Sequence, residues 1–260
     1  MKVIILCGGQ GTRLREETEY RPKPLVDIGG HPILWHIMKL YAHYGYREFV
    51  LCLGYRGNMI KEYFLNYEAM NSDFTISLGK QSGITYHDAH REQDYKVTLA
   101  ETGQETMTGA RVKRVERYID DDLFMITYGD GVSNVNIKSL VAFHKAHGRL
   151  ATITAVQPYS RYGILDIEDD GLVTHFTEKP QMKGWASAGY FVCNRRVMDY
   201  LRVDPSCILE QDPLEHLAHD EQLMTYRHEG FFYAMDTYRE YLYLNELWNS
   251  GRAPWKVWES

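Results

Sequence analysis

The chain has 260 residues, of which 44% are hydrophobic and 25% are charged, and it contains only 8 prolines. These values lie close to globular averages and exclude a disordered, collagen-like or coiled-coil protein. The 29 Lys and Arg residues against 35 Asp and Glu give a net charge of -6, so the chain lacks the basic surface of a general nucleic-acid binder. An anionic ligand must therefore be met by local groups of basic residues.

The cysteines and the N-terminus predict a cytoplasmic protein. The four cysteines stand mostly in apolar runs and lack the C-x-x-C spacing of zinc sites, so we expect buried thiols in a reducing compartment. The apolar run after Met1-Lys2 is too short for a secretory signal. No segment approaches the run of about eighteen apolar residues that a membrane span needs, so no membrane partner is expected.

The first part of the chain alternates apolar runs with helical periodicity, which is typical of a mostly parallel sheet with helices on both faces. Buried strands are predicted at 3–7, 49–53, 123–128 and 150–156, and helices at 32–44, 56–66 and 137–147. Gly45 and Gly148 are placed to end two of these helices. The periodicity fails between Gly79 and Arg114, which predicts a functional loop or a strand insertion there.

After residue 157 the pattern changes to short β-rich runs. Asp169-Asp170-Gly171 lies between runs at 163–167 and 172–177 and predicts an antiparallel hairpin. Further elements are predicted as a strand at 185–193, a short helix opened and capped by Asp212-Pro213, a strand at 231–235 and a helix at 237–249. We therefore predict a single α/β domain over 1–260, with a Rossmann-like mixed, mostly parallel sheet flanked by helices and a smaller antiparallel region.

A glycine-rich turn, Gly8-Gly9-Gln10-Gly11-Thr12-Arg13, directly follows the first predicted strand. Glycines let backbone N–H groups approach a ligand closely, and Thr12 and Arg13 add a hydroxyl and a cation, so the turn could hold phosphates. A plain tight turn is an equal alternative for this feature alone. Leu14 stands where the dinucleotide-binding pattern needs a third glycine, which weakens the alternative of a nicotinamide dehydrogenase.

Lys23 lies between Pro22 and Pro24, shortly after this turn. The prolines favour an extended backbone outside any helix, which fixes the direction of the ammonium group. A solvent-exposed lysine is the simpler interpretation. Its place in the sequence nevertheless favours a contact with the same phosphates, as a point charge.

Two aspartates follow predicted strands. Asp130 stands between Gly129 and Gly131, and Asp236 follows the strand at 231–235. Open α/β sheets bind ligands at the carboxyl ends of their strands, and carboxylates there can bind Mg²⁺ beside phosphates. The alternatives are an Asp-Gly turn for Asp130 and a helix cap for Asp236, and the cap is favoured for that residue taken alone. Together with the glycine turn and the lysine, the aspartates predict a metal-assisted phosphate site.

These motifs resemble those of the sugar-phosphate nucleotidylyltransferase family. Gly8 to Leu14 with Lys23-Pro24, and the F-x-E-K-P segment Phe176 to Pro180, are similar to two signatures of that family. Other segments resemble, more narrowly, the glucose-1-phosphate cytidylyltransferases: Thr102-Gly103, Met107 to Arg111, Thr127 to Gly131, Met235-Asp236-Thr237 and Ala253 to Lys256. The resemblance extends over essentially the whole chain.

The resemblance implies an enzyme that transfers a cytidylyl group from CTP to a sugar 1-phosphate, in the first instance α-D-glucose 1-phosphate, with Mg²⁺ as cofactor. An oxygen of the sugar phosphate would attack the α-phosphorus in line and pyrophosphate would leave, without a covalent nucleophile. A different phosphorylated substrate and a nucleotide sensor without turnover are the alternatives. The complete set of lysines and aspartates argues against the sensor.

The resemblance also implies residue roles. The nucleotide would be bound by Leu6, Gly8, Gly9, Gln10, Gly11, Thr12, Arg13, Lys23, Thr106, Arg111 and Gly129, with Thr106 and Arg111 in the segment that reads cytosine and ribose. The sugar phosphate would be bound by Tyr162, Gly163, Glu178, Lys179 and Ser187. Asp130 and Asp236 would bind Mg²⁺, while Arg13, Lys23 and Asp130 would act in catalysis. Residues 1–157 would thus form a nucleotide-binding half and 158–235 a sugar-phosphate-binding half, followed by a C-terminal helix and tail at 236–260.

Two positions depart from the glucose-type pattern. Ser187-Ala188-Gly189 replaces an Asn-Gly-Gly run. Because Ser is shorter than Asn, a contact with a sugar hydroxyl is altered, which affects the identity of the sugar more than that of the nucleotide. Ala110 replaces a glycine, which strains the loop if the position needs a positive φ and is neutral otherwise. Tyr238, Tyr241 and Leu242 on the last helix suggest additional apolar surface, for which core packing is the simpler interpretation and an oligomer interface is the alternative. The resemblance favours the interface, because members of the family are commonly oligomeric, and so implies a homo-oligomer.

Overall fold

The computed structural model describes residues 1–260 except 80–82, 88–89, 91, 93 and 260. Its centre is one sheet of seven strands: β1 (Val3–Leu6), β4 (Glu48–Leu53), β7 (Lys96–Glu101), β8 (Leu123–Tyr128), β10 (Ala151–Val156), β13 (Ala186–Asn194) and β14 (Leu223–Arg227). Their order is β14-β10-β13-β8-β1-β4-β7. Only β13 runs antiparallel to its neighbours, β8 and β10, whereas the other pairs in this sheet are parallel. The predicted mixed, mostly parallel sheet is confirmed.

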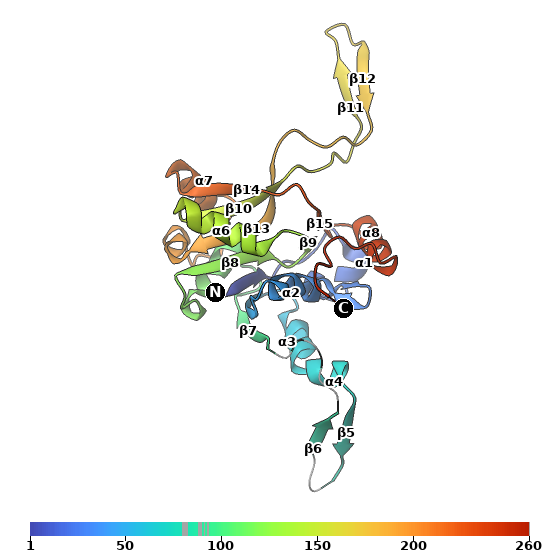
Figure 1. The fold of residues 1–260 in the computed structure, drawn as a ribbon, viewed down its shortest axis with the longest axis vertical. Coiled ribbons are helices and arrows are strands. Elements are labelled where there is room, and N and C mark those ends of the chain that lie inside the picture. The colour runs from blue at the N-terminus through green and yellow to red at the C-terminus, as the bar shows by residue number, and fades with distance from the viewer. Residues whose placement is uncertain (80–82, 88–89, 91, 93, 260) are drawn as a thin grey trace.

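Helices cover both faces of this sheet (Figure 1). The first face packs against α2 (Ile33–His43), α3 (Gly57–Leu65), α6 (Ile137–His147) and α8 (Tyr238–Asn249). The second face packs against α5 (Thr108–Arg114), α7 (Asp212–His219) and a 3-10 helix at Arg195–Tyr200. Alternate residues of β1 face opposite cores, because Val3 and Ile5 lie in the first cluster and Ile4 lies in the second.

The remaining short elements connect this body. They are α1 (Arg15–Thr18), a 3-10 helix at Lys23–Leu25, β2 (Asp27–Ile28), β3 (His31–Pro32), α4 (Tyr67–Asn71), a 3-10 helix at Glu116–Tyr118, β9 (Gly131–Ser133) and β15 (Phe232–Ala234). β9 pairs with β15 outside the main sheet. The backbone N–H of Met235 also donates to the carbonyl oxygen of Asp130 (2.8 Å), so the segments that carry the two predicted metal ligands run side by side.

Most predicted elements are confirmed to within two residues. α6 ends at Gly148, whose φ of 67° is a left-handed conformation that glycine adopts without strain. Gln211 is the N-cap of α7, so the prediction that Asp212 caps this helix was wrong, and Asp212 is its first helical residue. β14, an edge strand beside β10, was not predicted.

The stretch between Gly79 and Arg114 contains more regular structure than the sequence suggested. β7 joins the main sheet in parallel beside β4, and α5 packs on its second face. β7 lacks an apolar run because it is an edge strand in which Lys96 and Glu101 are exposed and Thr98 is only partly buried. Among the described residues of this stretch, the predicted strand insertion corresponds to β6 (Gly83–Tyr86), which pairs with β5 (Phe74–Ser77) as a hairpin.

Two hairpins project from opposite sides of the body (Figure 1). One is β5–β6, and the other, predicted from its Asp-Gly turn, is β11 (Ile164–Ile167) with β12 (Val173–Thr177). Both carry exposed apolar side chains, among them Ile76, Leu78, Ile167, Leu172 and Phe176. The four cysteines are free and buried, as predicted. Within the described part of the chain, no helix is long and apolar enough to cross a membrane.

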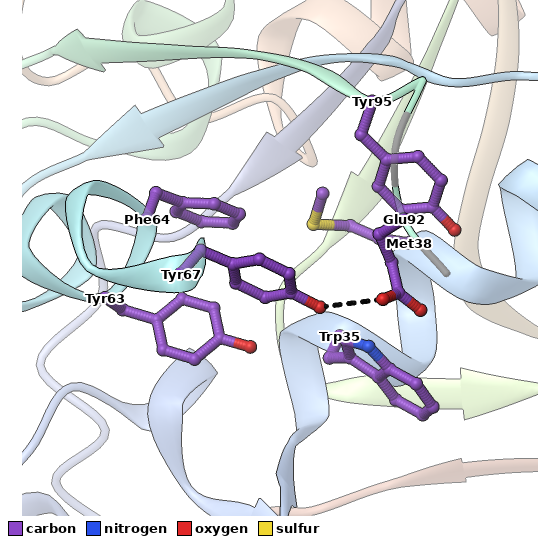
Figure 2. A pocket seen from close by; sticks show the side chains of 7 residues that line it. All are labelled: Trp35, Met38, Tyr63, Phe64, Tyr67, Glu92 and Tyr95. Carbon is purple, nitrogen blue, oxygen red and sulfur yellow. Dashed lines mark hydrogen bonds between the residues drawn. The ribbon is translucent and has the colours of Figure 1, made fainter. Parts of the chain in front are cut away.

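A small aromatic cavity of about 40 Å³ lies between α2, α3, α4 and the loop before β7 (Figure 2). Inside it the carboxylate of Glu92 accepts hydrogen bonds from Lys39 Nζ (2.9 Å) and from the Tyr67 hydroxyl (3.1 Å). Lys39 Nζ also lies 5.3 Å from the centroid of the Trp35 ring. Aromatic rings attract cations, and here a lysine of the chain itself takes that place. The volume is far below the roughly 300 Å³ of the smaller ligand pockets. We therefore assign this cavity to packing.

The Lys39–Glu92 pair should make stability depend on pH. Burial alone raises the pKa of Glu92, but the hydrogen bond and charge of Lys39 outweigh burial and lower it below its usual value. A carboxyl group whose pKa is lowered by folding stabilises the folded state at every pH above its ordinary, unfolded pKa. This stabilisation is lost as the pH falls through the lowered pKa of the folded state.

We expect Glu92→Gln to reduce the free energy of unfolding at neutral pH by about 1 to 3 kcal/mol, because Lys39 loses its buried partner. Denaturant unfolding of both proteins should show this difference shrinking as the pH is lowered into the acid range. Glu62→Gln, at an exposed position on α3, is the matched control. A Glu92→Gln penalty that stayed constant with pH would contradict the assignment.

Candidate active site

A cavity of about 410 Å³ lies at the carboxyl ends of β1 and β8. From β1 the chain continues to β4 on one side of the sheet, whereas from β8 it continues to β10 on the other side. Open α/β sheets bind ligands at such a switch point. The predicted residues that line the cavity are Leu6, Gly8, Gly9, Gly11, Thr12, Arg13, Lys23, Thr106, Arg111, Gly129 and Asp130. Gln10 is not among the lining residues.

Arg111 holds the glycine turn in place by hydrogen bonds to the main chain. Its Nη2 donates to the carbonyl oxygen of Gly8 (3.0 Å), and its Nη1 donates to those of Leu53 (3.0 Å) and Gly103 (2.7 Å). A Cβ at Gly8 would lie 2.2 Å from the guanidinium group, so this close approach requires glycine. The structure therefore gives Arg111 a part in holding the turn, and its predicted contact with cytosine or ribose stays a prediction.

Thr106 and Ala110 lie on either side of the start of α5. Thr106 is buried, lines the cavity and accepts a hydrogen bond from Arg114 Nη1 (2.8 Å). Ala110 lies inside α5 and has no positive φ. The alternative in which alanine strains this position is therefore excluded.

Lys23 joins the two predicted magnesium ligands. Its Nζ lies 2.7 Å from Oδ2 of Asp130 and 2.8 Å from Oδ1 of Asp236. Its side chain is only 10% exposed, which excludes the interpretation as a surface lysine. Burial alone lowers the pKa of Lys23, but the two carboxylates outweigh burial and raise it above its ordinary value. Lys23 is therefore a fixed positive charge at the edge of the cavity.

The predicted backbone around Lys23 was partly wrong. Pro22 is extended, with φ -66° and ψ 145°, but residues Lys23–Leu25 form a short 3-10 helix. Pro24 is tolerated there because the first turn of a helix does not use its missing N–H group. The ammonium group is therefore directed by this turn and by its two carboxylates.

Asp236 precedes α8 without capping it. Thr237 is the N-cap and forms a capping box with Glu240. The Asp236 carboxylate pairs with Lys23 and lies 3.2 Å from Arg13 Nη1. Burial alone raises the pKa of Asp236, but Lys23, followed by Arg13, outweighs burial and lowers it. Asp236 thus stays ionised, and the helix-cap alternative is excluded.

The two aspartates have the chemistry of a magnesium site that a bound phosphate would complete. Mg²⁺ in phosphate sites is held by one or two carboxylates together with phosphate oxygens and water. Asp130 and Asp236 present such oxygens around one ammonium group beside the glycine turn. Across the described residues, no group of three or more His, Cys, Asp or Glu side chains could hold a metal. The two carboxylates therefore fit this ion only in company with a ligand.

The residues predicted for the sugar phosphate lie outside this cavity, whose described lining includes none of them. Tyr162 and Gly163 precede β11, and Glu178 and Lys179 follow β12, at the base of one projecting hairpin (Figure 1). Glu178 and Lys179 pair with each other at 2.9 Å. In this conformation the sugar set is therefore not assembled around the glycine turn.

One ion pair links the base of that hairpin to the aspartate cluster. Arg161 Nη2 lies 3.1 Å from Oε1 of Glu240. The other oxygen of Glu240 accepts hydrogen bonds from the backbone N–H groups of Asp236 (2.6 Å) and Thr237 (2.7 Å). Ser187, the remaining member of the sugar set, accepts a hydrogen bond from the Gly189 backbone (3.2 Å). The sugar-binding assignments remain predictions.

Several lining residues were not predicted as site residues: Cys7, Pro24, Met107, Thr108, Tyr128, Ile208 and Glu210. Glu210 accepts hydrogen bonds from the Tyr128 hydroxyl and from Thr108 Oγ1 (2.6 Å). It lies in an irregular segment between Arg195–Tyr200 and α7, without a motif or periodicity that could have identified it. Burial raises the pKa of the Cys7 thiol well above its usual range, so this thiol is a poor nucleophile.

Comparisons with known proteins identify the family of this chain. A family model described as nucleotidyl transferase matches residues 2–230. The glucose-1-phosphate cytidylyltransferase of Salmonella typhi is 49% identical over 261 residues, covering 100% of both chains. The probable glucose-1-phosphate cytidylyltransferase of Bacillus subtilis is 45% identical, covering 99% of this chain and 100% of that protein.

A solved structure shares the fold. HddC from Yersinia pseudotuberculosis has a TM-score of 0.69 and 23% sequence identity, covering 95% of this chain and 99% of that chain. At this identity the likeness concerns the fold alone. The family resemblance drawn from the glycine turn, Lys23 and the F-x-E-K-P segment is confirmed by the family model and by the full-length relatives. The chain belongs to the nucleotidyl transferase family.

Proposed function

We propose that this protein transfers a cytidylyl group from CTP to α-D-glucose 1-phosphate, giving CDP-glucose and pyrophosphate. The observation that carries the proposal is the Lys23 ammonium held between Asp130 and Asp236 at a cavity lined by the glycine turn. Identity of 49% with the Salmonella enzyme supports CTP and glucose 1-phosphate as the substrates. The complete cluster argues against a sensor without turnover.

The chain's own residues would bind and orient the two anionic substrates. Backbone N–H groups of the glycine turn, with Arg13 and Lys23, would hold the CTP phosphates. Lys23 is fixed by its carboxylates, whereas the Arg13 side chain is 71% exposed and can follow the phosphates. Mg²⁺ bound by Asp130 and Asp236 would neutralise charge on the reacting phosphates. Fixed charges of this kind lower the barrier because they need no rearrangement during the reaction.

We propose that the base of the β11–β12 hairpin binds the sugar phosphate. The Glu178–Lys179 pair is exposed and would separate on binding, Glu178 accepting from sugar hydroxyls and Lys179 meeting the phosphate. Tyr162, Gly163 and Ser187 belong to the same set. The Arg161–Glu240 ion pair supports a location of this set beside Asp236.

We also propose a cytoplasmic homo-oligomer in which other copies cover the projecting hairpins. Both hairpins expose large hydrophobic residues: exposures range from 41% at Tyr86 to 86% at Leu78 on the first, and Ile167 and Leu172 are each 61% exposed on the second. Two-stranded hairpins are marginally stable alone, and exposed apolar patches on this scale favour association. The buried free thiols support a reducing compartment.

A pyrophosphate-release assay over a grid of nucleoside triphosphates and sugar 1-phosphates tests the function. We expect release with CTP and glucose 1-phosphate, and much slower release with UTP, dTTP or GTP, because a mismatched base leaves buried polar groups unpaired. Equal rates with CTP and UTP would refute the nucleotide assignment. Activity with another sugar phosphate but not with glucose 1-phosphate would refute the assignment of glucose as the sugar. The assignment of the reaction as nucleotidyl transfer would still hold.

Asp236→Asn keeps the size of the side chain and removes its charge. We expect kcat to fall by about two orders of magnitude or more while the fold is retained, because a divalent cation would lose one of its two carboxylates. Steady-state kinetics with circular dichroism measure both effects. Asp199→Asn, at an exposed position outside the cavity, is the control. Near-normal turnover in Asp236→Asn would show that Asp236 is not a metal ligand in the active site.

The two lysines should affect different substrates. Each would contribute a charge-assisted contact of roughly 1.5 to 3 kcal/mol, which substitution by Met removes. We expect Lys179→Met to raise mainly the KM for sugar phosphate, and Lys23→Met to depress kcat and the use of CTP together. If Lys179→Met raised only the KM for CTP, the assignment of the hairpin to the sugar phosphate would be wrong.

A further inference from the structure

Glu210 is a second carboxylate in the nucleotide cavity, and no cation of the described chain pairs with it. The other carboxylate that lines the cavity, Asp130, is neutralised by Lys23. The hydrogen-bond partners of Glu210 are two neutral hydroxyl groups, those of Tyr128 and Thr108. An exposed carboxylate that faces a ligand cavity without a counter-ion is available to a donor on the ligand.

The two hydroxyl groups hold this carboxylate in a defined position. Thr108 Oγ1 accepts a hydrogen bond from the Leu209 backbone N–H (2.9 Å) and donates to Glu210 Oε2 (2.6 Å). The Tyr128 hydroxyl donates to the other carboxylate oxygen. Each oxygen keeps a further lone pair, so Glu210 can accept from a ligand without breaking either contact.

The charges of the cavity determine which part of a nucleotide can lie beside Glu210. Lys23 and Arg13 both pair with Asp236 and neither pairs with Glu210, so the positive charge available to phosphates lies beside Asp236. Arg111 donates to main-chain carbonyl oxygens and to the Thr102 hydroxyl. A carboxylate repels phosphate, so the group beside Glu210 must be uncharged and must donate hydrogen bonds.

The neighbours of Glu210 favour a nucleobase over a sugar. Met107 and Ile208 flank the Thr108–Glu210 contact along the chain, and both line the cavity. Met107 is 44% exposed, so an apolar surface is available to a ligand there. Apolar side chains suit the faces of a planar base, whereas a sugar needs polar partners around its ring.

We propose that Glu210 accepts a hydrogen bond from the 4-amino group of cytosine and thereby selects CTP over UTP. The proposal rests on the proposed function, because it concerns the base of that nucleotide. Cytosine presents a donor at this position, and Glu and Asp side chains accept from it in other recognition sites. Uracil presents a carbonyl oxygen there, which the carboxylate repels.

Glu210→Gln tests this assignment, with calorimetric binding of CTP, UTP and dCTP in the presence of Mg²⁺. We expect CTP and dCTP to bind about tenfold more weakly or worse, because the charge-assisted hydrogen bond is lost. UTP should bind as well as before or better, since the Gln amide can donate to its carbonyl oxygen. Glu215→Gln, an exposed neighbour on α7, is the matched control and should leave all three affinities unchanged.

Three results would overturn the assignment. An unchanged ratio of CTP to UTP affinity would mean that Glu210 does not read the base. A loss for CTP and UTP but not for dCTP would assign Glu210 to the ribose 2′-hydroxyl, and weaker binding of glucose 1-phosphate with unchanged binding of the nucleotides would assign it to the sugar. Binding is measured without turnover, so a protein that binds CTP selectively but releases no pyrophosphate would reject the proposed reaction and leave the Glu210 assignment supported.

Discussion

The Lys23 ammonium, shared between Asp130 and Asp236, is the interaction on which the rest of the site depends. A buried lysine without a carboxylate partner would tend to lose its charge, and the two carboxylates raise the pKa of Lys23 instead. Lys23 in turn lowers the pKa of Asp236 and keeps that carboxylate ionised. The backbone bond from Met235 to Asp130 brings the two aspartate segments together, although they are distant in the sequence. The free protein thus holds charges in place for phosphates and a divalent ion.

The cavity beside this cluster is lined by groups of opposite charge. Lys23 and Arg13 are cationic and line it together with the glycine turn, whose shape is fixed by the hydrogen bond from Arg111 to Gly8. Glu210 is an anionic lining residue that is oriented by neutral hydroxyl groups. A nucleotide also has two chemically different parts, anionic phosphates and a neutral base. Electrostatics therefore favours phosphates beside Lys23 and Arg13 and the base beside Glu210.

The parts of the fold that the sequence predicted are those in which local pattern and tertiary position agree. β8 and α6 were predicted to the residue, because β8 is a buried apolar run and α6 has clear periodicity with a glycine stop. β7 and β14 are edge strands, where mixed composition hides the alternation. The glycine turn and both aspartates follow strands and carry motifs, so they were predicted. The burial of Lys23 and the position of Glu210 depend on partners far away in the chain, which no local pattern reveals.

We propose that the cytidylyl group passes directly between two bound substrates. The thiol of Cys7, which lines the cavity, is buried, and burial raises its pKa well above its usual range, so it is unsuited to form a covalent intermediate. Direct transfer can be tested by following the configuration at the α-phosphorus, with CTP that carries sulfur at one defined position on that phosphorus. A single in-line displacement predicts inversion of configuration in the nucleotide-sugar product. Retention would require two successive displacements and would contradict direct transfer.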